Sequence, residues 1–258
     1  SDNTISILKE YEKLNKISRY SGNNIGPQNS FFDLMKNSPQ SDYYAFSDQD
    51  DIWNPDKLEQ GIKMLKGNDI VPCVYFSNAI TVDKNGNILD KKVYEKCPML
   101  DFYTLSISGG ILGCTMIFNN KMMECIKSQK DSIGIVMHDY FVAMLCKAVG
   151  GKIIYDDQCN MKYRQHESNA VGVNTTKNIF ARFCKDVSKK YNCSIADQAK
   201  LIMRNHKLEE DKYNWLVQIS NYRDSFINSL VLAISFKTKY KDLKSSLKNR
   251  IALLLRNR

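Results

Sequence analysis

Short apolar segments alternate with amphipathic segments of helical period over the first 155 residues of this 258-residue chain. Apolar runs of four to eight residues predict buried strands, and apolar residues spaced three or four apart predict helices. The expected strands are 16–20, 43–47, 73–78, 114–118 and 152–155, and the expected helices are 4–14, 27–36, 56–65, 120–129 and 138–148. Asn85-Gly86 suits a hairpin turn. This alternation predicts an α/β fold whose mostly parallel sheet is covered by helices on both faces.

Glycine and proline disappear from position 174 onward, where long helical patterns follow, as at 196–210 and 220–235. We therefore expect a domain at 1–173 and a helical C-terminal extension at 174–258. The segment 236–258 carries eight lysine and arginine residues against the single acid Asp242, with leucine and isoleucine at helical spacing. This pattern predicts a basic amphipathic helix that docks on an anionic membrane. A solvated or partner-binding helix is the alternative.

The composition excludes several classes of protein. With 43% hydrophobic residues, 12 Gly and 5 Pro, the chain is neither disordered nor fibrous. The net charge of +9 would suit nucleic acid, lipid or a phosphorylated substrate, but no nucleic-acid recognition motif is present, so no nucleic-acid partner is predicted. The eight cysteines lack the spacing of a zinc site or a disulfide framework, and no segment has the length of a membrane span or the pattern of a signal peptide. We expect a cytoplasmic protein.

Three carboxylates, Asp48, Asp50 and Asp51, stand between an expected strand and an expected helix. Carboxylates this close repel one another unless a cation neutralises them. Mg²⁺ and Mn²⁺ prefer oxygen ligands, take one or two carboxylates and complete their shell with water and substrate phosphates. The cluster therefore indicates a divalent-cation site that receives a diphosphate. The alternative is that Asp51 and Asp56 cap the helix while Asp48 is solvated.

Asp139, at the start of the expected helix 138–148, is the candidate general base. A carboxylate can take the proton of a hydroxyl that lies within hydrogen-bond reach. A helix N-terminus should lower its proton affinity, so orientation should contribute much of its effect. The alternative is that Asp139 only caps the helix. Arg164 and His166, which follow an expected strand, are residue types that bind phosphate or, for His166, a metal.

The string at 47–58, Ser-Asp-Gln-Asp-Asp-Ile-Trp-Asn-Pro-Asp-Lys-Leu, resembles the D-x-D region of family 2 glycosyltransferases, especially the rhamnosyltransferase-like branch. Further segments resemble family motifs in the same order along the chain. They are 1–4 (the end of D-D-G-S-x-D-x-T), 24–29 (N-x-G-x-x-x-N), 109–116 (a small-residue segment), 137–141 (the base segment) and 163–172 (Y-R-Q-H-x-x-N-x-x-G). The family's first strand and first nucleotide-binding acids precede these motifs, so the resemblance predicts an N-terminally truncated chain.

The resemblance implies a GT-A (nucleotide-diphospho-sugar transferase) fold, Rossmann-like, and an inverting, metal-dependent transfer. It assigns the base to Asp139 and the Mg²⁺ or Mn²⁺ ligands to Asp48, Asp50 and His166. It implies donor binding by Asn24, Gly26, Gln28, Asp48, Arg164 and His166, and acceptor binding by Gly113, Cys114 and His138. Trp53 is a further candidate for acceptor binding, because aromatic faces suit the apolar surfaces of sugar rings. From the residues alone, Trp53 is as well explained by core packing, and the glycines by turns and tight backbone packing.

The resemblance also implies the substrates. The donor is dTDP-rhamnose or a UDP-hexose, and the acceptor is a saccharide, possibly lipid-linked, in bacterial surface polysaccharide synthesis. Peripheral contact with the inner face of the plasma membrane through 236–258 would place the protein near such an acceptor. The alternative function is a non-catalytic glycosyltransferase-like module that binds a nucleotide or a polysaccharide.

Overall fold

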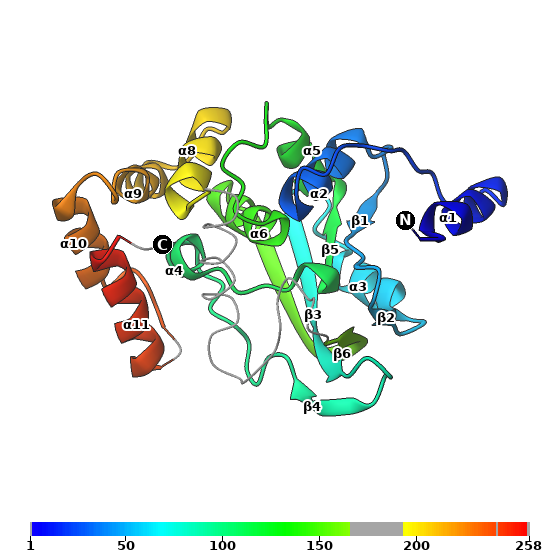
Figure 1. Cartoon of the computed structure of the whole chain (residues 1–258). Coiled ribbons are helices and arrows are strands. Elements are labelled where there is room, and N and C mark those ends of the chain that lie inside the picture. Colours follow the sequence, from blue (N-terminus) through cyan, green and yellow to red (C-terminus); the bar gives the residue numbers. More distant parts are fainter. Residues whose placement is uncertain (1, 166–192, 241, 257–258) are drawn as a thin grey trace.

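The computed structural model describes residues 2–165, 193–240 and 242–256. In this part of the chain a six-stranded sheet has the strand order β1-β5-β3-β6-β2, and β4 pairs with the end of β3 (Figure 1). The strands are β1 (Tyr43–Ala45), β2 (Ile52–Trp53), β3 (Cys73–Val82), β4 (Ile88–Lys92), β5 (Met116–Asn119) and β6 (Lys152–Arg164).

The strands of this sheet run in mixed directions. Among the described residues, β3 and β6 pair in parallel, for example at Cys73 and Lys152, and the other four pairings are antiparallel. The α/β class is therefore confirmed, but the expected mostly parallel sheet is corrected to a mixed one. Strands that are buried on both faces form continuous apolar runs, so their hydrophobic pattern does not show whether neighbouring strands run parallel or antiparallel.

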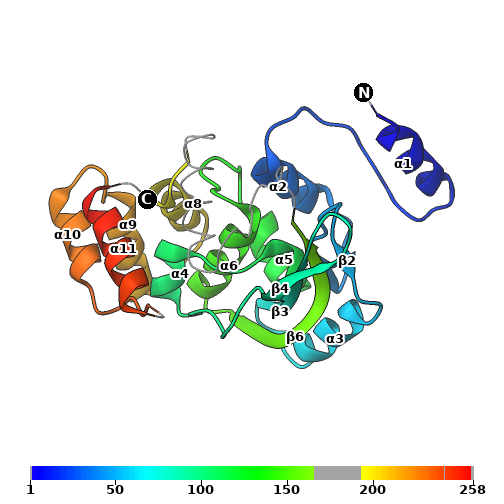
Figure 2. The same cartoon turned by 60° about the horizontal axis from the view of Figure 1, so that its bottom comes forward.

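Helices cover both faces of the sheet (Figure 2). Along β3, Tyr75 faces a cluster that includes Leu65 at the end of α3, whereas Val74 and Phe76 face the larger core formed with the helices of the other face. This alternation is the period of two that a strand imposes on its side chains. The covering helices are α3 (Lys57–Leu65) on one face and α2 (Pro27–Asn37), α5 (Asn120–Lys127) and α6 (His138–Ala148) on the other.

The predicted hairpin joins β3 to β4. Oδ1 of Asp83 accepts hydrogen bonds from the N–H groups of Asn85 and Asn87 at 2.8 and 2.9 Å, and Gly86 has φ of 89°. Glycine adopts this left-handed conformation at little cost, which explains the Asn-Gly pair at the turn.

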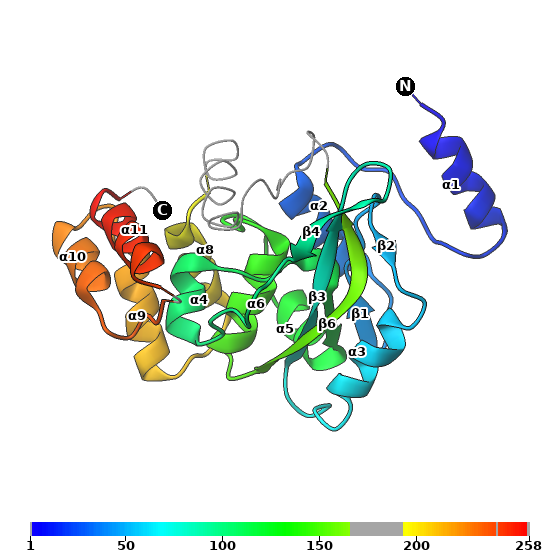
Figure 3. The same cartoon turned by 90° about the horizontal axis from the view of Figure 1, so that it is seen from below.

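The predicted N-terminal helix is confirmed as α1 (Thr4–Lys13), which lies apart from the sheet in all three views and has no buried residue (Figures 1 to 3). The strand expected at 16–20 is wrong, because this segment is irregular. A strand requires a neighbour for its backbone N–H and C=O groups, and no described strand pairs with this segment.

The remaining helices are α4 (Phe102–Ser108), α8 (Ile195–Asn205), α9 (Glu210–Ser220), α10 (Phe226–Ile234) and α11 (Leu243–Leu254), with a short 3₁₀ turn η1 (Gly113–Thr115) before β5. Nε1 of Trp215 in α9 donates to Oγ of Ser106 in α4 at 2.8 Å, which ties this helical region to the α/β core. The helix expected at 220–235 is shorter in the structure, because α9 ends at Ser220 and α10 begins only after its N-cap residue Ser225. Among the described residues no helix has the length and hydrophobicity needed to cross a bilayer.

Candidate active site

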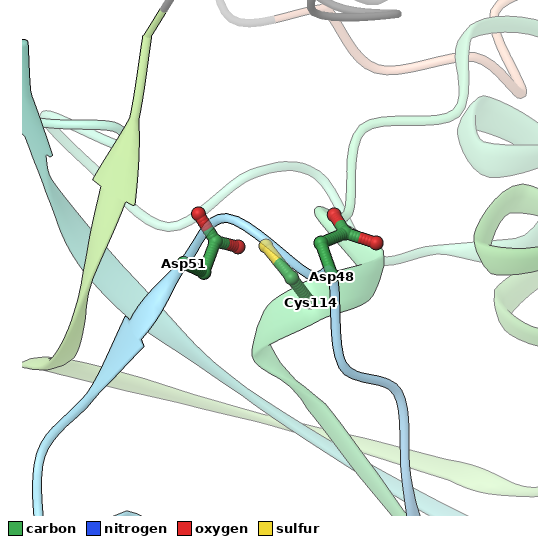
Figure 4. Close-up of side chains that lie close together, drawn as sticks. All are labelled: Asp48, Asp51 and Cys114. Carbon is green, nitrogen blue, oxygen red and sulfur yellow. The ribbon is translucent and has the colours of Figure 1, made fainter. Parts of the chain in front are cut away.

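Two aspartates of the loop between β1 and β2 meet a cysteine of η1. Ligand atoms of Asp48, Asp51 and Cys114 all lie within 4.8 Å of one another. The sulfur of Cys114, carried by η1, lies between the two carboxylates in Figure 4. The acidic loop is held in place by pairing of β2 with β6 and by the N–H of Arg164, which donates to Oδ1 of Asp51 at 3.1 Å.

Burial and mutual repulsion raise the proton affinity of this cluster. The pKa of Asp48 is raised to about 6, first by burial and then by the charges of Asp51 and Asp50. Burial also raises the pKa of Asp51, and it raises the pKa of the Cys114 thiol well above its usual value. Oδ2 of Asp51 is buried without a hydrogen-bond partner among the described residues. Crowded carboxylates with a buried, unpartnered oxygen fit a divalent cation.

The donor set also bears on which cation fits. The two carboxylates suit Mg²⁺ or Mn²⁺, whereas a thiol favours a cation softer than Mg²⁺. The group is therefore compatible with a divalent cation, and Cys114 makes it a better match for Mn²⁺ than for Mg²⁺.

The structure groups one of the predicted cation ligands with two other residues. Asp48 is in the cluster, but Asp51 and Cys114 accompany it, and Asp50 is not a member of the group. The backbone carbonyl of Asp50 accepts from Nε of Arg164 at 2.8 Å. His166 lies outside the described residues, so its role and that of the Asp50 carboxylate stay predictions. Sequence reasoning had included Asp51 in the acidic cluster but not among the ligands.

The helix-cap alternative for the acidic loop has little support. Asp56 occupies the N-cap position of α3, but its side chain makes no capping hydrogen bond. Asp51 precedes β2 and accepts from Arg164 instead.

Asp139 lies in the first turn of α6, and its side chain is 7% exposed. Its Oδ2 accepts from the N–H of Gly113 at 3.0 Å, and its Oδ1 accepts from the N–H of Tyr140 at 2.7 Å. Burial nevertheless raises the pKa of Asp139 to about 7, and these backbone donors only partly oppose it. The expected lowering of its proton affinity is therefore wrong, because desolvation outweighs the helix N-terminus. A carboxylate with a pKa near neutrality is well matched to general-base catalysis.

Gly113 is the close contact that joins the two halves of the site. A Cβ atom at this position would lie 2.9 Å from Nε2 of His138 and 3.2 Å from Oδ2 of Asp139. Any side chain would therefore displace the side chains of His138 and Asp139 at the start of α6. Because Cys114 is the next residue, the single turn η1 positions Asp139 on one side and reaches the acidic cluster on the other.

His138 is a neutral ring in an aromatic cluster. It stacks on Phe31 of α2 with ring centroids 3.9 Å apart, and the ring of Phe46, two residues before Asp48, approaches it edge-on at 4.7 Å. Burial lowers the pKa of His138 to about 3. The cluster thus joins α2, the acidic loop and α6, and the acceptor role of His138 stays a prediction.

The predicted donor residues of the 24–29 segment lie at the N-terminus of α2. Oδ1 of Asn24 accepts from the N–H of Gly26 at 3.3 Å, and Gly26 has φ of 82°. Gln28 is 1% exposed, and neither polar atom of its amide has a hydrogen-bond partner among the described residues. A buried, unpaired amide is costly unless another group satisfies it, which makes Gln28 notable among these residues.

The other two predicted contacts have structural partners. Nη1 of Arg164 donates to the carbonyl of Lys84 at 2.5 Å, so its guanidinium braces the acidic loop against the β3–β4 hairpin. The ring of Trp53 packs in a small cluster with Met161 and Tyr163 and faces Nζ of Lys57 at 3.6 Å. The packing role considered for Trp53 thus has physical support, and its contact with the acceptor stays a prediction.

Comparison with known proteins relates this chain to one family. Residues 1–126 match the family model described as glycosyl transferase family 2. In this chain the matched segment forms part of a sheet that helices cover on both faces, and a helical extension follows. This arrangement is the GT-A architecture. The fold and the matched segment are those of a family 2 glycosyltransferase, and the chain is similar to rhamnosyltransferase-like members of that family.

One relative matches along nearly the whole chain. The dTDP-rhamnosyl transferase RfbG of Shigella flexneri is 27% identical over 255 residues, which cover 92% of this chain and 81% of that protein. Among solved structures, S. aureus TarS 1-349 aligns with 98% of this chain and 68% of that chain, at 16% identity and a TM-score of 0.47.

Proposed function

We propose that the protein is an inverting, divalent-cation-dependent glycosyltransferase that moves a sugar from a nucleotide diphosphate to a saccharide hydroxyl. One observation carries this proposal. Within the η1 turn, the N–H of Gly113 holds the carboxylate of Asp139, whose pKa is about 7. The next residue of the turn, Cys114, places its thiol in the cluster with Asp48 and Asp51. A base and an acidic cation site are the two components that such a transfer needs.

Asp48, Asp51 and Cys114 would hold the cation, with Asp50 and His166 as further predicted ligands. A divalent cation bound there supplies charge stabilisation to the diphosphate leaving group.

Asp139 acts on the acceptor. Its unprotonated carboxylate accepts the proton of the acceptor hydroxyl as the hydroxyl oxygen bonds to the anomeric carbon and the bond from that carbon to the diphosphate oxygen breaks. A single displacement of this kind inverts the anomeric configuration. The buried surroundings keep the Asp139 carboxylate basic enough for this role, and the N–H groups of Gly113 and Tyr140 fix its orientation.

The preferred donor is dTDP-rhamnose. Support comes from the 47–58 and 163–172 strings and from the name of the Shigella relative. A UDP-hexose is the alternative donor. The proposed contacts to either donor are Asn24, Gly26, Gln28, Asp48, Arg164 and His166. The acceptor is a saccharide, possibly lipid-linked, in the synthesis of a bacterial surface polysaccharide.

The C-terminal helices support a cytoplasmic protein that contacts the inner face of the plasma membrane. Ile227 of α10 and Leu243 of α11 are 71% and 86% exposed, and Phe236 between the helices is 95% exposed. α10 contains no charged residue, whereas α11 adds Lys244 and Lys248. Both helices lie at the end of the molecule opposite α1 (Figure 3). Apolar side chains next to cations match an anionic bilayer surface.

A transfer assay with defined products tests the central proposal. The protein is incubated with dTDP-rhamnose or UDP-hexoses, Mn²⁺ and oligosaccharide acceptors, and the anomeric configuration of the product is read by NMR. Metal-dependent transfer with inversion supports the enzyme. Metal-dependent nucleotide binding without transfer to any acceptor would instead support the non-catalytic binding module.

A further inference from the structure

The hydroxyl of Tyr94 binds the residue that precedes Gly113. The N–H of Leu112 donates to the hydroxyl oxygen of Tyr94 at 2.7 Å. The N–H of Gly113 donates to Oδ2 of Asp139 at 3.0 Å. Two successive N–H groups of one segment therefore bind a phenol and the proposed base.

Tyr94 is itself held in place by β3 and by two aromatic rings. The fully buried Asn78 of β3 accepts the N–H of Tyr94 at its Oδ1, at 3.0 Å, and donates from Nδ2 to the carbonyl of Tyr94 at 2.7 Å. The rings of Phe76 and Tyr155 meet the Tyr94 ring edge-on, with centroids 5.8 and 6.0 Å away. Because its backbone and its ring are both held, Tyr94 offers Leu112 an acceptor at a fixed position.

Two glycines precede the residue that Tyr94 anchors. Gly109 and Gly110 have φ of 62° and 132°. Glycine adopts many conformations at similar energy, so these residues restrict the path of the following chain only weakly. A part-buried N–H that loses its acceptor is costly, which favours the conformation that keeps Leu112 on the phenol. The Tyr94 hydroxyl therefore selects the path by which the chain enters η1.

The peptide unit between Leu112 and Gly113 is held at both of its polar groups. The carbonyl of Leu112 accepts from the N–H of Thr115 at 3.1 Å and from its Oγ1 at 2.7 Å. The N–H of Gly113 belongs to the same planar unit, so its direction follows from that of the carbonyl. Tyr94 holds the preceding peptide unit through the Leu112 N–H. Movement of Leu112 would therefore turn the Gly113 N–H away from the Asp139 carboxylate.

We infer that Tyr94 is a positioning residue for the proposed transfer: its hydroxyl holds Leu112, and thereby the Gly113 N–H that orients Asp139. This inference rests on the proposed function for the role of Asp139 as the base. It goes further, because it assigns the orientation of that base to a side chain that lies outside the acidic loop, η1 and α6.

Hydrogen exchange of backbone amides, read by NMR, tests the structural part of this inference without any substrate. Tyr94→Phe removes the hydroxyl and keeps the ring. Relative to the amides of β6, exchange at Leu112 and Gly113 should become roughly fivefold faster or more, because a part-buried hydrogen bond is lost. Tyr44→Phe is the matched control, since the Tyr44 hydroxyl oxygen also accepts a backbone N–H, that of Ser41 at 2.8 Å. It should leave exchange at Gly113 unchanged.

Single-turnover transfer, measured with and without Asp139→Asn, tests the catalytic part. Tyr94→Phe should slow transfer roughly tenfold in a protein that retains Asp139. In the Asp139→Asn background it should slow transfer by less than about twofold, because a base that is absent cannot be misplaced. A role of Tyr94 that is independent of the base would lower both rates by the same factor.

The two measurements separate this inference from the proposed function. Faster exchange at Gly113, together with a rate loss that depends on Asp139, supports the inference. Unchanged exchange at Gly113 in Tyr94→Phe would overturn it, and so would equal rate losses with and without Asp139. Faster exchange at Gly113 with no transfer by any of the proteins would support the hold of Tyr94 on the turn and contradict the proposed function.

Discussion

Gly113 and Asp139 form the contact that organises the site. The N–H of Gly113 donates to Oδ2 of Asp139 at 3.0 Å, and the absence of a side chain on Gly113 leaves room for His138 and Asp139 together. The next residue, Cys114, contributes its sulfur to the cluster with Asp48 and Asp51. A change at this turn should therefore affect the proposed base and the proposed cation site at the same time.

Substitution of Gly113 tests this link. Gly113→Ala should displace the side chains of His138 and Asp139, because the new Cβ would lie within 3.0 Å of Nε2 of His138. We expect a destabilisation of about 1 to 3 kcal/mol, measured by thermal unfolding, with a loss of transfer activity beyond what unfolding explains. Gly22→Ala is the control, since a Cβ there meets no atom within 4 Å. Ordinary activity and stability in Gly113→Ala would show that the turn tolerates a side chain.

Asp139→Asn should remove the proposed base and keep the shape of the side chain. The transfer rate should fall by about 10²- to 10⁴-fold, the usual contribution of general-base catalysis. Metal-dependent binding of dTDP or UDP should persist, because Asp139 is not one of the three clustered residues. Asp211→Asn, which also lies in the first turn of a helix and is exposed, is the control. If Asp139→Asn turned over normally, another group would have to be the base.

The pH dependence of the reaction should report the same carboxylate. Asp139 must be unprotonated to accept a proton, so kcat/KM should fall as the pH is lowered through about 7. This acidic limb belongs to Asp139 if single-turnover rates of Asp139→Asn, measured with excess enzyme, no longer show it. A limb that is unchanged in the variant would assign it to a different group.

Protein stability should show the opposite trend with pH. The pKa of Asp139 in the folded state, about 7, lies above its ordinary value of 3.8, so between these values the folded state holds the proton more tightly. Its contribution to the free energy of unfolding is therefore fully present below about pH 4 and is lost as the pH rises through 7, by up to about 4 kcal/mol. Chemical denaturation of the unmodified protein and Asp139→Asn across this range checks the sign. A stability difference that is independent of pH would contradict the raised pKa.

The identity of the cation ligands can be tested at Asp51 and Cys114. Asp51→Asn should weaken Mn²⁺-dependent nucleotide binding roughly tenfold or more, because a charged ligand with a buried, unpartnered oxygen is lost. Cys114→Ser should shift the preference toward Mg²⁺, since a hydroxyl is a harder ligand than a thiol. Asp56→Asn, an exposed residue of the same loop, should bind as before. Unchanged calorimetric titrations of Asp51→Asn would return the ligand role to Asp50.

The exposed C-terminal surface predicts binding to anionic vesicles. Replacing Leu243 and Leu247 with Glu should reduce sedimentation with vesicles that contain phosphatidylglycerol, because both apolar contact and charge attraction are lost. Ile70→Glu, which alters a residue that is 88% exposed elsewhere, controls for added acid on the surface. Equal binding to neutral vesicles, or none by the unmodified protein, would contradict a lipid partner, and concentration-dependent self-association would indicate a second copy of the chain instead.

Local sequence patterns determined the elements of this protein and several residues of its site. The apolar run at 73–78 specified β3, the apolar period of 138–148 specified α6, and Asn85-Gly86 specified the hairpin, because each depends on interactions between near neighbours. The acidic string and Asp139 stood out for the same reason, since their residue types suggest chemistry before any contact is known.

Only the tertiary structure decided how these parts act together. The pairing directions of the strands, the irregular course of 16–20, the meeting of Asp51 with Cys114 and the burial of Lys57 all depend on residues far apart in the chain. The raised pKa of Asp139 is the clearest case. From the sequence, its helix N-terminus predicted a lower proton affinity, but desolvation by packing around α6 and η1 is the larger effect and reverses the sign.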